Sequence, residues 1–524
     1  MELGVGGSNP PCCTKIMSKE KKLKPELASG FIDRKGNELI LKDRLIEIIK
    51  RNFQLYGFEP LETPGFEISE NIGKFLPDED RPMSGVFGFK DDKNWISLRY
   101  DLTAPLARYF AANENLISKP FKRYQAGTVW RNEKPGPGRF KEFTQIDADI
   151  VGTKNILADA DMCILLADTL NKCGLDKNEF IIRVSNRKCF FGILNWLGIS
   201  SERQRIAITR AVDKYDRIGI EGVASLLGKG RKDKSGDFTK GVGLNKKQIK
   251  QITEYIEENT LYDTEGNANF PDPTKYAPLA QYDFLDPLYD EGQKELSNFF
   301  KNTQLSEFKN QIVYSPTLVR GIEYYTGTIF EANLLFKVKN QKGQEVEFGS
   351  IGGGGRYDGL VSRFTNNIAP ATGVSIGLDR LLVGIQQRDN FWKNNKEIEN
   401  TGPVVICVFD EKQIAQYNKL LLLLRSSNIN SEIYCGDGSL KAQMKYADKR
   451  NAPAVILYGD NEIKSGTVTI KNLKLGKEAS AKITKREDWT NIEKAEELGK
   501  KERSKSFQIT TKIENLVNEI KKLL

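Results

Sequence analysis

Hydrophobic and polar positions in the first part of the chain follow two different periods. From Glu38 to Gly57, leucine, isoleucine and phenylalanine recur three or four residues apart, which predicts a helix that ends at the glycine. Residues 58–66 contain two prolines and are typical of extended chain. Two strand-like runs at 121–131 and 139–151 are separated by a short loop rich in glycine and proline. This pattern predicts a long antiparallel hairpin.

The middle of the chain is largely helical in its pattern, and strands return beyond it. The predicted elements are helices at 155–175, over most of 190–310 and at 377–387, a polar Gly/Lys-rich loop at 228–241, strands at 314–332 and 348–351, and a glycine-rich turn at 352–355 that leads into a helix. A long, mostly helical segment therefore lies between two sets of strands.

A polar linker near residues 391–402 precedes a segment with a different order of elements. Strands at 404–409, 432–434 and 454–458 alternate with helices at 413–424 and 440–450. This alternation predicts a small domain with a parallel or mixed sheet. The resulting division is a tail over 1–23, a first domain over 24–395 with a helical insertion at about 195–310, a second domain over 403–485, and a charged helical extension over 486–524.

The first residues do not have the pattern of a targeting signal. They lack the basic start and apolar core of a secretory signal, and they lack the arginines of a transit peptide. Met17 opens a Lys/Glu-rich stretch that is typical of a protein start, so one hypothesis is that the natural coding sequence begins there. The alternative is an ordinary disordered tail. N-terminal sequencing of the natural protein distinguishes the two.

Composition restricts the class of protein. With 39% hydrophobic and 28% charged residues, and no uninterrupted apolar run long enough to span a bilayer, the chain is expected to be soluble and not membrane-bound. Its seven cysteines form no CxxC pair, which argues against a disulfide framework or a zinc site and favours a reducing cytoplasm. The net charge of +9, concentrated in the last quarter, suggests a polyanionic partner.

The chain contains no histidine. Imidazole is therefore excluded as a general base, a nucleophile or a metal ligand. Any chemistry must use arginine, lysine, carboxylates, backbone groups or a bound metal.

The predicted hairpin carries a group of residues suited to a nucleoside triphosphate. Its first strand ends with Arg131 and Glu133, and its second begins with Arg139 and Phe143. A guanidinium fork matches phosphate oxygens, and a flat ring stacks on a base. The spacing, Arg-x-Glu, a short Gly/Pro loop and then Arg-x-x-x-Phe, resembles motif 2 of the class II aminoacyl-tRNA synthetases.

Other motifs of that class occur in the same order along the chain. Residues Phe58–Glu67 resemble motif 1, which builds the dimer interface, and Gly373–Arg380 resemble motif 3, which ends in an arginine. Leu318–Gly327 and Gly352–Gly359 look like the two peptides peculiar to histidyl-tRNA synthetases, although Glu323 stands where that family usually has Asp. The resemblance implies an α+β catalytic domain on an antiparallel sheet, of the class II synthetase type, with a helical insertion, and a C-terminal α/β anticodon-binding domain.

The resemblance also implies roles for single residues. At the ATP end, Arg131 would bind the α-phosphate, Arg139 and Arg380 the γ-phosphate, Glu133 the adenine amino group, and Phe143 would stack on the base. At the amino-acid end, Asp101, Thr103 and Gln145 would hold the α-amino group, Asp149 and Tyr325, next to Tyr324, would read the imidazole nitrogens, and Arg320 would stabilise the transition state. Arg320 and Arg131 are the expected catalytic residues.

The C-terminal domain is expected to contact tRNA. Its basic residues Lys441, Lys445, Lys449 and Arg450 recur at helical spacing and so predict one cationic face. For the loop at 228–241 two interpretations are open, a solvated insertion and a contact with the tRNA acceptor stem.

The implied protein is an enzyme that activates histidine with ATP, accompanied by Mg²⁺, and transfers it to tRNA(His), as a homodimer in the cytoplasm. No metal ligands are assigned. Three alternatives are a non-catalytic paralogue that regulates histidine biosynthesis, a nucleic-acid-binding or accessory protein on the same fold, and a synthetase for another amino acid. The phosphate-binding arginines argue against the first two, and Asp149 with Tyr325 argues against the third. The missing histidines fit either selection for synthesis during histidine starvation or drift in an AT-rich genome.

Overall fold

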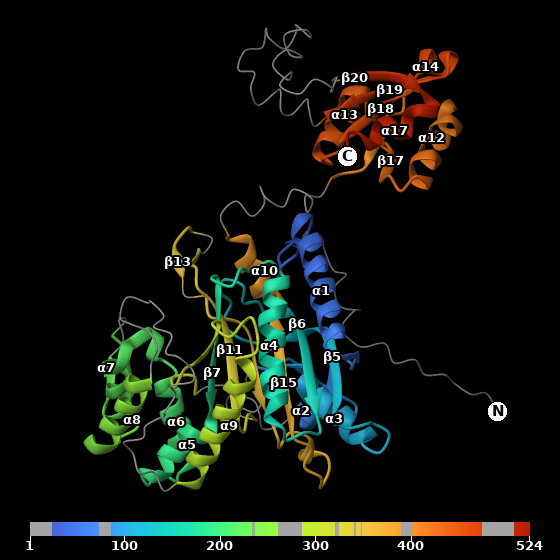
Figure 1. Cartoon of the computed structure of the whole chain (residues 1–524). Coiled ribbons are helices and arrows are strands. Elements are labelled where there is room, and N and C mark those ends of the chain that lie inside the picture. The colour runs from blue at the N-terminus through green and yellow to red at the C-terminus, as the bar shows by residue number, and fades with distance from the viewer. Residues whose placement is uncertain are drawn as a thin grey trace, which may run out of the picture. The chain divides into compact units, whose positions relative to one another are not determined.

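The computed structural model describes residues 24–72, 85–232, 236–259, 286–319, 324–339, 342–346, 348–388, 401–473 and 508–524. The chain divides into two compact units, Met1–Phe391 and Trp392–Leu524 (Figure 1). The proposed tail over 1–23, with the question of Met17, lies outside the described residues.

An eight-stranded sheet forms the centre of the first unit. Its strands, in spatial order, are β1 (Glu59–Pro60), β5 (Phe121–Trp130), β6 (Glu142–Val151), β15 (Ala371–Gly377), β14 (Ser350–Arg356), β11 (Thr328–Leu334), β7 (Phe180–Asn186) and β10 (Ile312–Tyr314). The six inner strands pair antiparallel, and only the edge strands β1 and β10 pair parallel with their neighbours. This confirms the predicted antiparallel sheet and the hairpin of β5 and β6. Strand β7 was not predicted.

Three helices cover one face of this sheet (Figure 1). They are α1 (Asn37–Leu55), α4 (Ile156–Lys172) and α9 (Pro287–Thr303). A Cβ at Gly352 would lie 3.2 Å from the Leu166 side chain of α4, and Gly352 pairs with Ile376, which pairs with Ile146. These apolar positions therefore face the helices, and the intervening residues of each strand face the other side.

Smaller elements complete the first unit. They are α3 (Thr103–Asn113), α10 (Leu378–Gln386), the three-stranded sheet of β2 (Phe66–Ile68), β4 (Asn94–Leu98) and β3 (Gly88–Asp91), α2 (Ser69–Ile72), the short pair β12 (Val338–Lys339) and β13 (Glu345–Val346), and the 3₁₀ helix η3 (Val361–Arg363). Between β7 and β10 the described insertion contains α5 (Arg187–Trp196), α6 (Glu202–Val212), α7 (Tyr215–Leu227), α8 (Lys246–Asn259) and α9.

Two loop predictions in this unit were wrong. Within the segment 228–241, β8 (Gly230–Lys232) and β9 (Phe238–Lys240) pair as a small antiparallel hairpin. The glycines at 352–355 do not form a turn but lie inside β14, paired on both sides. A Cβ at Gly354 would overlap the carbonyl oxygen of Gly373, so glycine is required because two strands approach closely, not because the chain turns.

The second unit is built on a five-stranded sheet. Its strands, in spatial order, are β17 (Ser431–Ile433), β16 (Val404–Ile406), β18 (Ala454–Leu457), β19 (Thr467–Asn472) and β20 (Gln508–Lys512), and its helices are α12 (Ile414–Ser426), α13 (Leu440–Lys449), α14 (Asp460–Ser465) and α17 (Leu516–Lys521). Strand β16 pairs parallel with β17 and β18. The predicted alternation of strands and helices is confirmed.

The C-terminal residues correct the prediction of a charged helical extension over 486–524. Strand β20 pairs along its length with β19, and Leu516 and Ile520 of α17 are fully buried in the core of this unit. The sequence Gln-Ile-Thr-Thr-Lys alternates in exposure, as a sheet-edge strand does. Its pairing partner, β19, is some forty residues away in the sequence. The charged residues around β20 therefore led to the prediction of an exposed helix instead of a paired strand.

Candidate active site

The face of the central sheet opposite α4 is polar along β6. Because side chains alternate across a strand, Phe143, Gln145, Asp147 and Asp149 share this face. At about 3.3 Å per residue, the distance from Phe143 to Asp149 is about 20 Å. We call these four residues of β6, Phe143, Gln145, Asp147 and Asp149, the polar row. A row of this length has room for a nucleotide at the Phe143 end and an amino acid at the Asp149 end.

Arg131, which follows β5, has a fixed orientation. Its guanidinium lies 4.4 Å from the centre of the Tyr100 ring and 5.2 Å from that of Phe143, and its Nε donates to the Tyr100 carbonyl oxygen at 3.1 Å. Its backbone N–H donates across the hairpin to the Lys141 carbonyl oxygen at 2.8 Å. The fork expected to bind a phosphate is therefore oriented before any ligand arrives.

Arg380, in the first turn of α10, occupies a space left by two glycines. A Cβ on Gly138 or Gly349 would lie 3.2 Å from its side chain, and both glycines have positive φ, 64° and 74°. Its Nη1 donates to the Ser350 carbonyl oxygen at 2.7 Å. Burial, reinforced by nearby Arg139, lowers the pKa of Arg380 to about 10. A desolvated cation beside a second cation is stabilised by a polyanion such as a triphosphate.

Tyr100 joins the residues at the nucleotide end. Besides stacking under Arg131, its hydroxyl donates to Glu133 at 3.1 Å, and burial raises its pKa to about 12. The structure thus brings together all five residues assigned to ATP from the sequence, namely Arg131, Glu133, Arg139, Phe143 and Arg380. Tyr100 was not among them, although it directly precedes the predicted Asp101.

At the other end of the row, Asp149 lies in a buried ion pair. Its Oδ2 is 2.8 Å from Nη2 of Arg123, whose side chain is 0% exposed, and the Tyr357 hydroxyl donates to its Oδ1. Arg123 Nη2 also donates to the Leu102 carbonyl oxygen at 2.9 Å. A Cβ at Gly373 would overlap the Asp149 carboxylate. Arg123, Tyr357 and the close approach of the backbone at Gly373 therefore fix the position of this carboxylate.

Asp101 and Thr103 lie at the amino end of α3. The Asp101 Oδ1 accepts from the backbone N–H groups of Thr103 at 3.1 Å and Ala104 at 2.9 Å, as a helix cap does. The buried Tyr324 hydroxyl shares a hydrogen bond with the Thr103 side chain, and its ring meets that of Tyr325 edge-on at 5.1 Å. The negative charges of Asp149 and Asp101 reinforce burial in raising the pKa of Tyr325. These residues therefore lie close together at this end of the row.

Asp147 is buried next to these residues but was not predicted. Burial, with Asp149 next to it, raises the pKa of Asp147 to about 7. Gln145, on one side of it along the strand, donates from Nε2 to the Ser375 hydroxyl at 2.7 Å. The alternation that places Gln145 and Asp149 on one face also places Asp147 there, so this signal was available in the sequence.

Arg320, the remaining predicted catalytic residue, lies outside the described residues, as does Glu323. Arg123 and Tyr357, which hold Asp149, were not found from the sequence, because their partner lies 26 and 208 residues away. Among the described residues no cluster of three or more aspartates, glutamates, cysteines or histidines is suited to hold a metal ion.

In the second unit, α13 presents the predicted cationic face. Lys441, Lys445 and Lys449 are exposed, whereas Gln443 is buried and bonds both the N–H and the carbonyl oxygen of Val408. The loop before α13 is held by the same glutamine, which also donates to the Gly438 carbonyl oxygen at 3.1 Å. One side of this helix is therefore anchored and the other is free to meet solvent or RNA.

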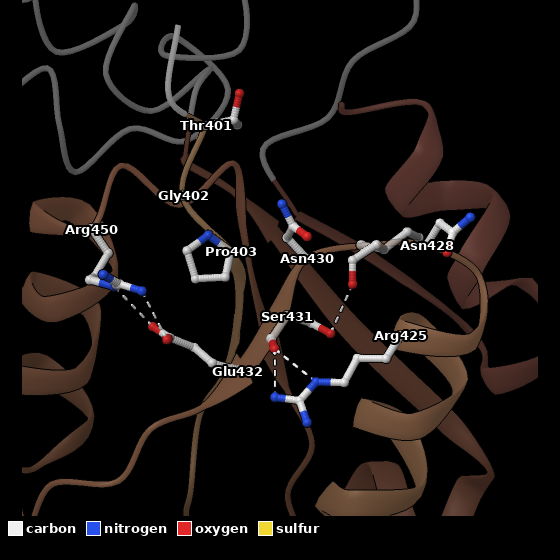
Figure 2. A pocket seen from close by; sticks show the side chains of 10 residues that line it. Thr401, Gly402, Pro403, Arg425, Asn428, Asn430, Ser431, Glu432 and Arg450 are labelled. Carbon is white, nitrogen blue, oxygen red and sulfur yellow. Dashed lines mark hydrogen bonds and ion pairs between the residues drawn. The ribbon is translucent and has the colours of Figure 1, made fainter. Parts of the chain in front are cut away.

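Arg450 differs from the three lysines. It is one of the residues that line a polar cavity of about 690 Å³. Figure 2 shows it paired with Glu432, while Arg425 donates to the Ser431 carbonyl oxygen. The Arg450–Glu432 pair has distances of 3.3 and 3.1 Å. Since its charge is balanced within the protein, Arg450 offers RNA less electrostatic attraction than the lysines do.

None of the described helices combines the length and apolarity needed to cross a lipid bilayer. Comparison with known proteins gives matches to both units. A family model described as Histidyl-tRNA synthetase matches residues 30–258 and 281–381, and one described as Anticodon binding domain matches residues 403–494.

Individual relatives extend over nearly the whole chain. The chain is 44% identical over 523 residues to Histidine--tRNA ligase of Bartonella henselae, with 97% of this chain and 99% of the relative covered. It is 43% identical over 515 residues to the protein of the same name from Brucella suis, with 97% and 98% covered. The solved histidyl-tRNA synthetase of Nostoc sp. PCC 7120 superposes with a TM-score of 0.66 at 25% identity, covering 96% of this chain and 100% of that one.

Proposed function

The chain belongs to the histidyl-tRNA synthetase family, and from this premise we propose how its residues divide the work of charging tRNA. It is a ligase that activates histidine with ATP to histidyl-adenylate and transfers the histidyl group to the 3′ end of tRNA(His). The observation that carries this function is 44% identity to a histidine--tRNA ligase over 97% of the chain. Because both units match, including the anticodon-binding domain, the regulatory paralogue is not favoured.

The arginines at the nucleotide end bind the triphosphate. Arg131, whose guanidinium is already oriented, binds oxygens of the α-phosphate, the group at which the reaction occurs. Arg139 and Arg380 bind the γ-phosphate. Glu133 receives the adenine amino group and Phe143 stacks on the ring. Mg²⁺ bound with ATP would neutralise phosphate charge, and the carboxylate of Glu331, whose negative charge acts on Arg380, is of the type that this ion prefers.

Histidine occupies the other end of the polar row. Asp101, Thr103 and Gln145 hold its α-amino group, and Asp149 and Tyr325, next to Tyr324, bind the imidazole nitrogens. The histidine carboxylate then attacks the α-phosphorus and pyrophosphate leaves, with Arg131 and Arg320 stabilising the charge that develops. Neither this step nor transfer to tRNA requires a protein general base, in keeping with a chain that has no histidine.

Pyrophosphate exchange with purified protein across all twenty amino acids, followed by aminoacylation of tRNA, tests this function. We expect exchange with histidine alone and charging of tRNA(His). Exchange with another amino acid would overturn the pocket assignment while keeping the enzyme class. Absence of exchange with all twenty would overturn the catalytic function.

Gly373→Ala tests the histidine pocket. The added methyl group overlaps the Asp149 carboxylate and displaces it from Arg123 and Tyr357. We expect the KM for histidine in pyrophosphate exchange to rise at least about tenfold, and the KM for ATP to change little. Gly359→Ala is the control, since a Cβ there meets no atom within 4 Å. Equal rises in both KM values would contradict the assignment.

We further propose that the enzyme is a homodimer. The small sheet next to the predicted interface motif has an apolar face on which Phe66, Ile68 and Phe89 are 54%, 43% and 49% exposed, with Ile96 on the same face. Phe66 and Phe89 meet edge-on at 5.7 Å. Adjacent apolar side chains that are exposed in a single copy are typical of a surface that a second copy covers.

Replacing Phe66 and Phe89 by Glu should therefore produce a monomer. Two charges on each copy would have to be buried in the interface without partners, which costs several kcal/mol. Light scattering at micromolar concentration measures the mass directly. Phe238→Glu is the matched control, because Phe238 is 60% exposed on β9, outside this sheet. A double variant that stays dimeric would place the interface elsewhere.

The tRNA contacts and the location complete the proposal. The anticodon-binding domain meets tRNA(His) through Lys441, Lys445 and Lys449, with a smaller contribution from Arg450. The enzyme acts in the cytoplasm, where the cysteines of the described residues, all of them free thiols, would stay reduced.

A further inference from the structure

Asp147 lies at the centre of the polar row and has no role in the mechanism above. Its side chain is only 1% exposed, and it is flanked along β6 by Gln145 and Asp149. On the neighbouring strands it lies opposite Gln125 of β5 and Ser375 of β15. A carboxyl group at so buried a position is costly unless its hydrogen-bonding capacity is used.

Two buried acceptor atoms near this position lack a donor. The Ser375 hydroxyl accepts from Gln145 Nε2 at 2.7 Å and also hydrogen-bonds Asp147, so it links the two side chains. Within the part of the chain that the structure describes, Asp147 Oδ1 and Gln145 Oε1 have no hydrogen-bond partner. Ser375 thus fixes one end of each side chain and leaves an oxygen of each for a ligand.

The two neighbouring carboxylates, Asp149 and Asp101, each have a hydrogen-bond or ion-pair partner within the protein. Asp149 is paired with Arg123 and accepts from Tyr357, and Asp101 caps α3. Asp149 Oδ2 accepts no hydrogen bond within the described residues but lies 2.8 Å from Arg123 Nη2, whereas Asp147 Oδ1 has neither a hydrogen bond nor an ion pair there. A ligand group that satisfies it together with Gln145 must supply at least two N–H donors and preferably a positive charge. A primary ammonium group has these properties, whereas a neutral imidazole offers one N–H.

We propose that Asp147 is a further specificity-determining residue, which together with Gln145 accepts hydrogen bonds from the α-ammonium group of the substrate histidine. This inference rests on the proposed function and adds a carboxylate to the residues assigned to that group. It leaves the imidazole to Asp149 and Tyr325, farther along the row. It also gives the ammonium group a carboxylate that, unlike Asp149, is not ion-paired with Arg123, although Arg123 lies near enough to act on both.

A dependence on pH follows from the surroundings of Asp147. Because burial and Asp149 raise its pKa to about 7, the free enzyme holds a proton there in part of the population at neutral pH. The ammonium group requires the ionised form, so binding releases a proton and weakens as the pH falls below about 7. The charged and titratable groups that face Asp147 are Asp149 on its own strand, Arg123 on β5, Arg99 and Asp101 before α3, and Tyr324 and Tyr325 before β11.

Asp147→Asn tests the proposal with three ligands measured by calorimetry on the full-length protein. Histidine and histidinol carry the ammonium group, and imidazole-propionate lacks it. We expect the variant to bind the first two about 10- to 100-fold more weakly than the wild type, the loss expected for one charge-assisted hydrogen bond, and to bind imidazole-propionate with unchanged affinity. We also expect proton release on histidine binding in the wild type and not in the variant. Comparing the two proteins cancels the titration of the ligand itself.

Three results would overturn the proposal. An equal loss for all three ligands would assign Asp147 to the imidazole, unchanged affinity for histidine would remove it from recognition, and a fall in kcat at unchanged affinity would assign it to the chemical step. Asp161→Asn, which neutralises a surface carboxylate of α4, is the matched control. A wild-type protein that binds and activates no histidine would refute the proposed function itself, whereas failure of the variant alone refutes only the role of Asp147.

Discussion

Asp149→Ala is expected to reduce histidine-dependent pyrophosphate exchange at least about 100-fold and to lower the free energy of unfolding by about 3–5 kcal/mol. The activity falls because the imidazole loses its charged acceptor. The stability falls because Arg123 is 0% exposed and loses the carboxylate 2.8 Å from its Nη2. A buried guanidinium without its counter-charge is among the most destabilising changes in a protein interior, and the Tyr357 hydroxyl loses its acceptor as well.

A second variant separates the two effects. Replacing both partners, as Arg123→Met with Asp149→Leu, removes the unpaired charge, and we expect it to recover most of the lost stability and none of the activity. Urea denaturation measures the stability, and pyrophosphate exchange measures the activity. If the double variant were as unstable as Asp149→Ala, the ion pair would not be the cause of the instability. If Asp149→Ala kept normal exchange, the carboxylate would have no part in recognition.

Arg131→Ala is expected to slow adenylate formation by about 10² to 10³, the loss typical of removing one preorganised donor at a site of developing charge. The wild-type guanidinium is held by the Tyr100 and Phe143 rings and by the Tyr100 carbonyl oxygen, so its orientation requires no rearrangement during the reaction. Because it contacts none of the residues assigned to histidine, the affinity for histidine should stay within about twofold.

Single-turnover adenylate formation and calorimetric histidine binding are the two measurements. Arg203→Ala, an exposed arginine of α6, is the matched control and should change neither. Arg131→Lys should recover little activity, since a lysine keeps the charge but has no planar fork to lie between the rings. A large loss of histidine affinity in Arg131→Ala would contradict the division of the row into a nucleotide end and an amino-acid end.

Local patterns in the sequence predicted most of the elements of the fold. The helix α1, the hairpin of β5 and β6 and the alternating elements of the second unit all follow from periodicity and turn residues within about thirty residues of one another. The prediction was wrong for the glycines at 352–355 and for the segment 508–512, where the conformation depends on partner strands distant in the sequence. Glycine favours a turn when the local chain decides, and it also permits a close approach of strands that no local pattern reveals.

The sequence by itself determined which residues are candidates for binding and catalysis. Arg131, Glu133, Arg139 and Phe143 were found because a hairpin places them near one end, and the motifs identified the family. Only the tertiary structure decided how they are held. Tyr100 under Arg131, Arg123 and Tyr357 on Asp149, and the space for Arg380 between Gly138 and Gly349 all arise from packing between distant segments. Whether a buried carboxylate such as Asp147 is satisfied or left open for a substrate depends on those neighbours, because desolvation and hydrogen bonding act through space and not along the chain.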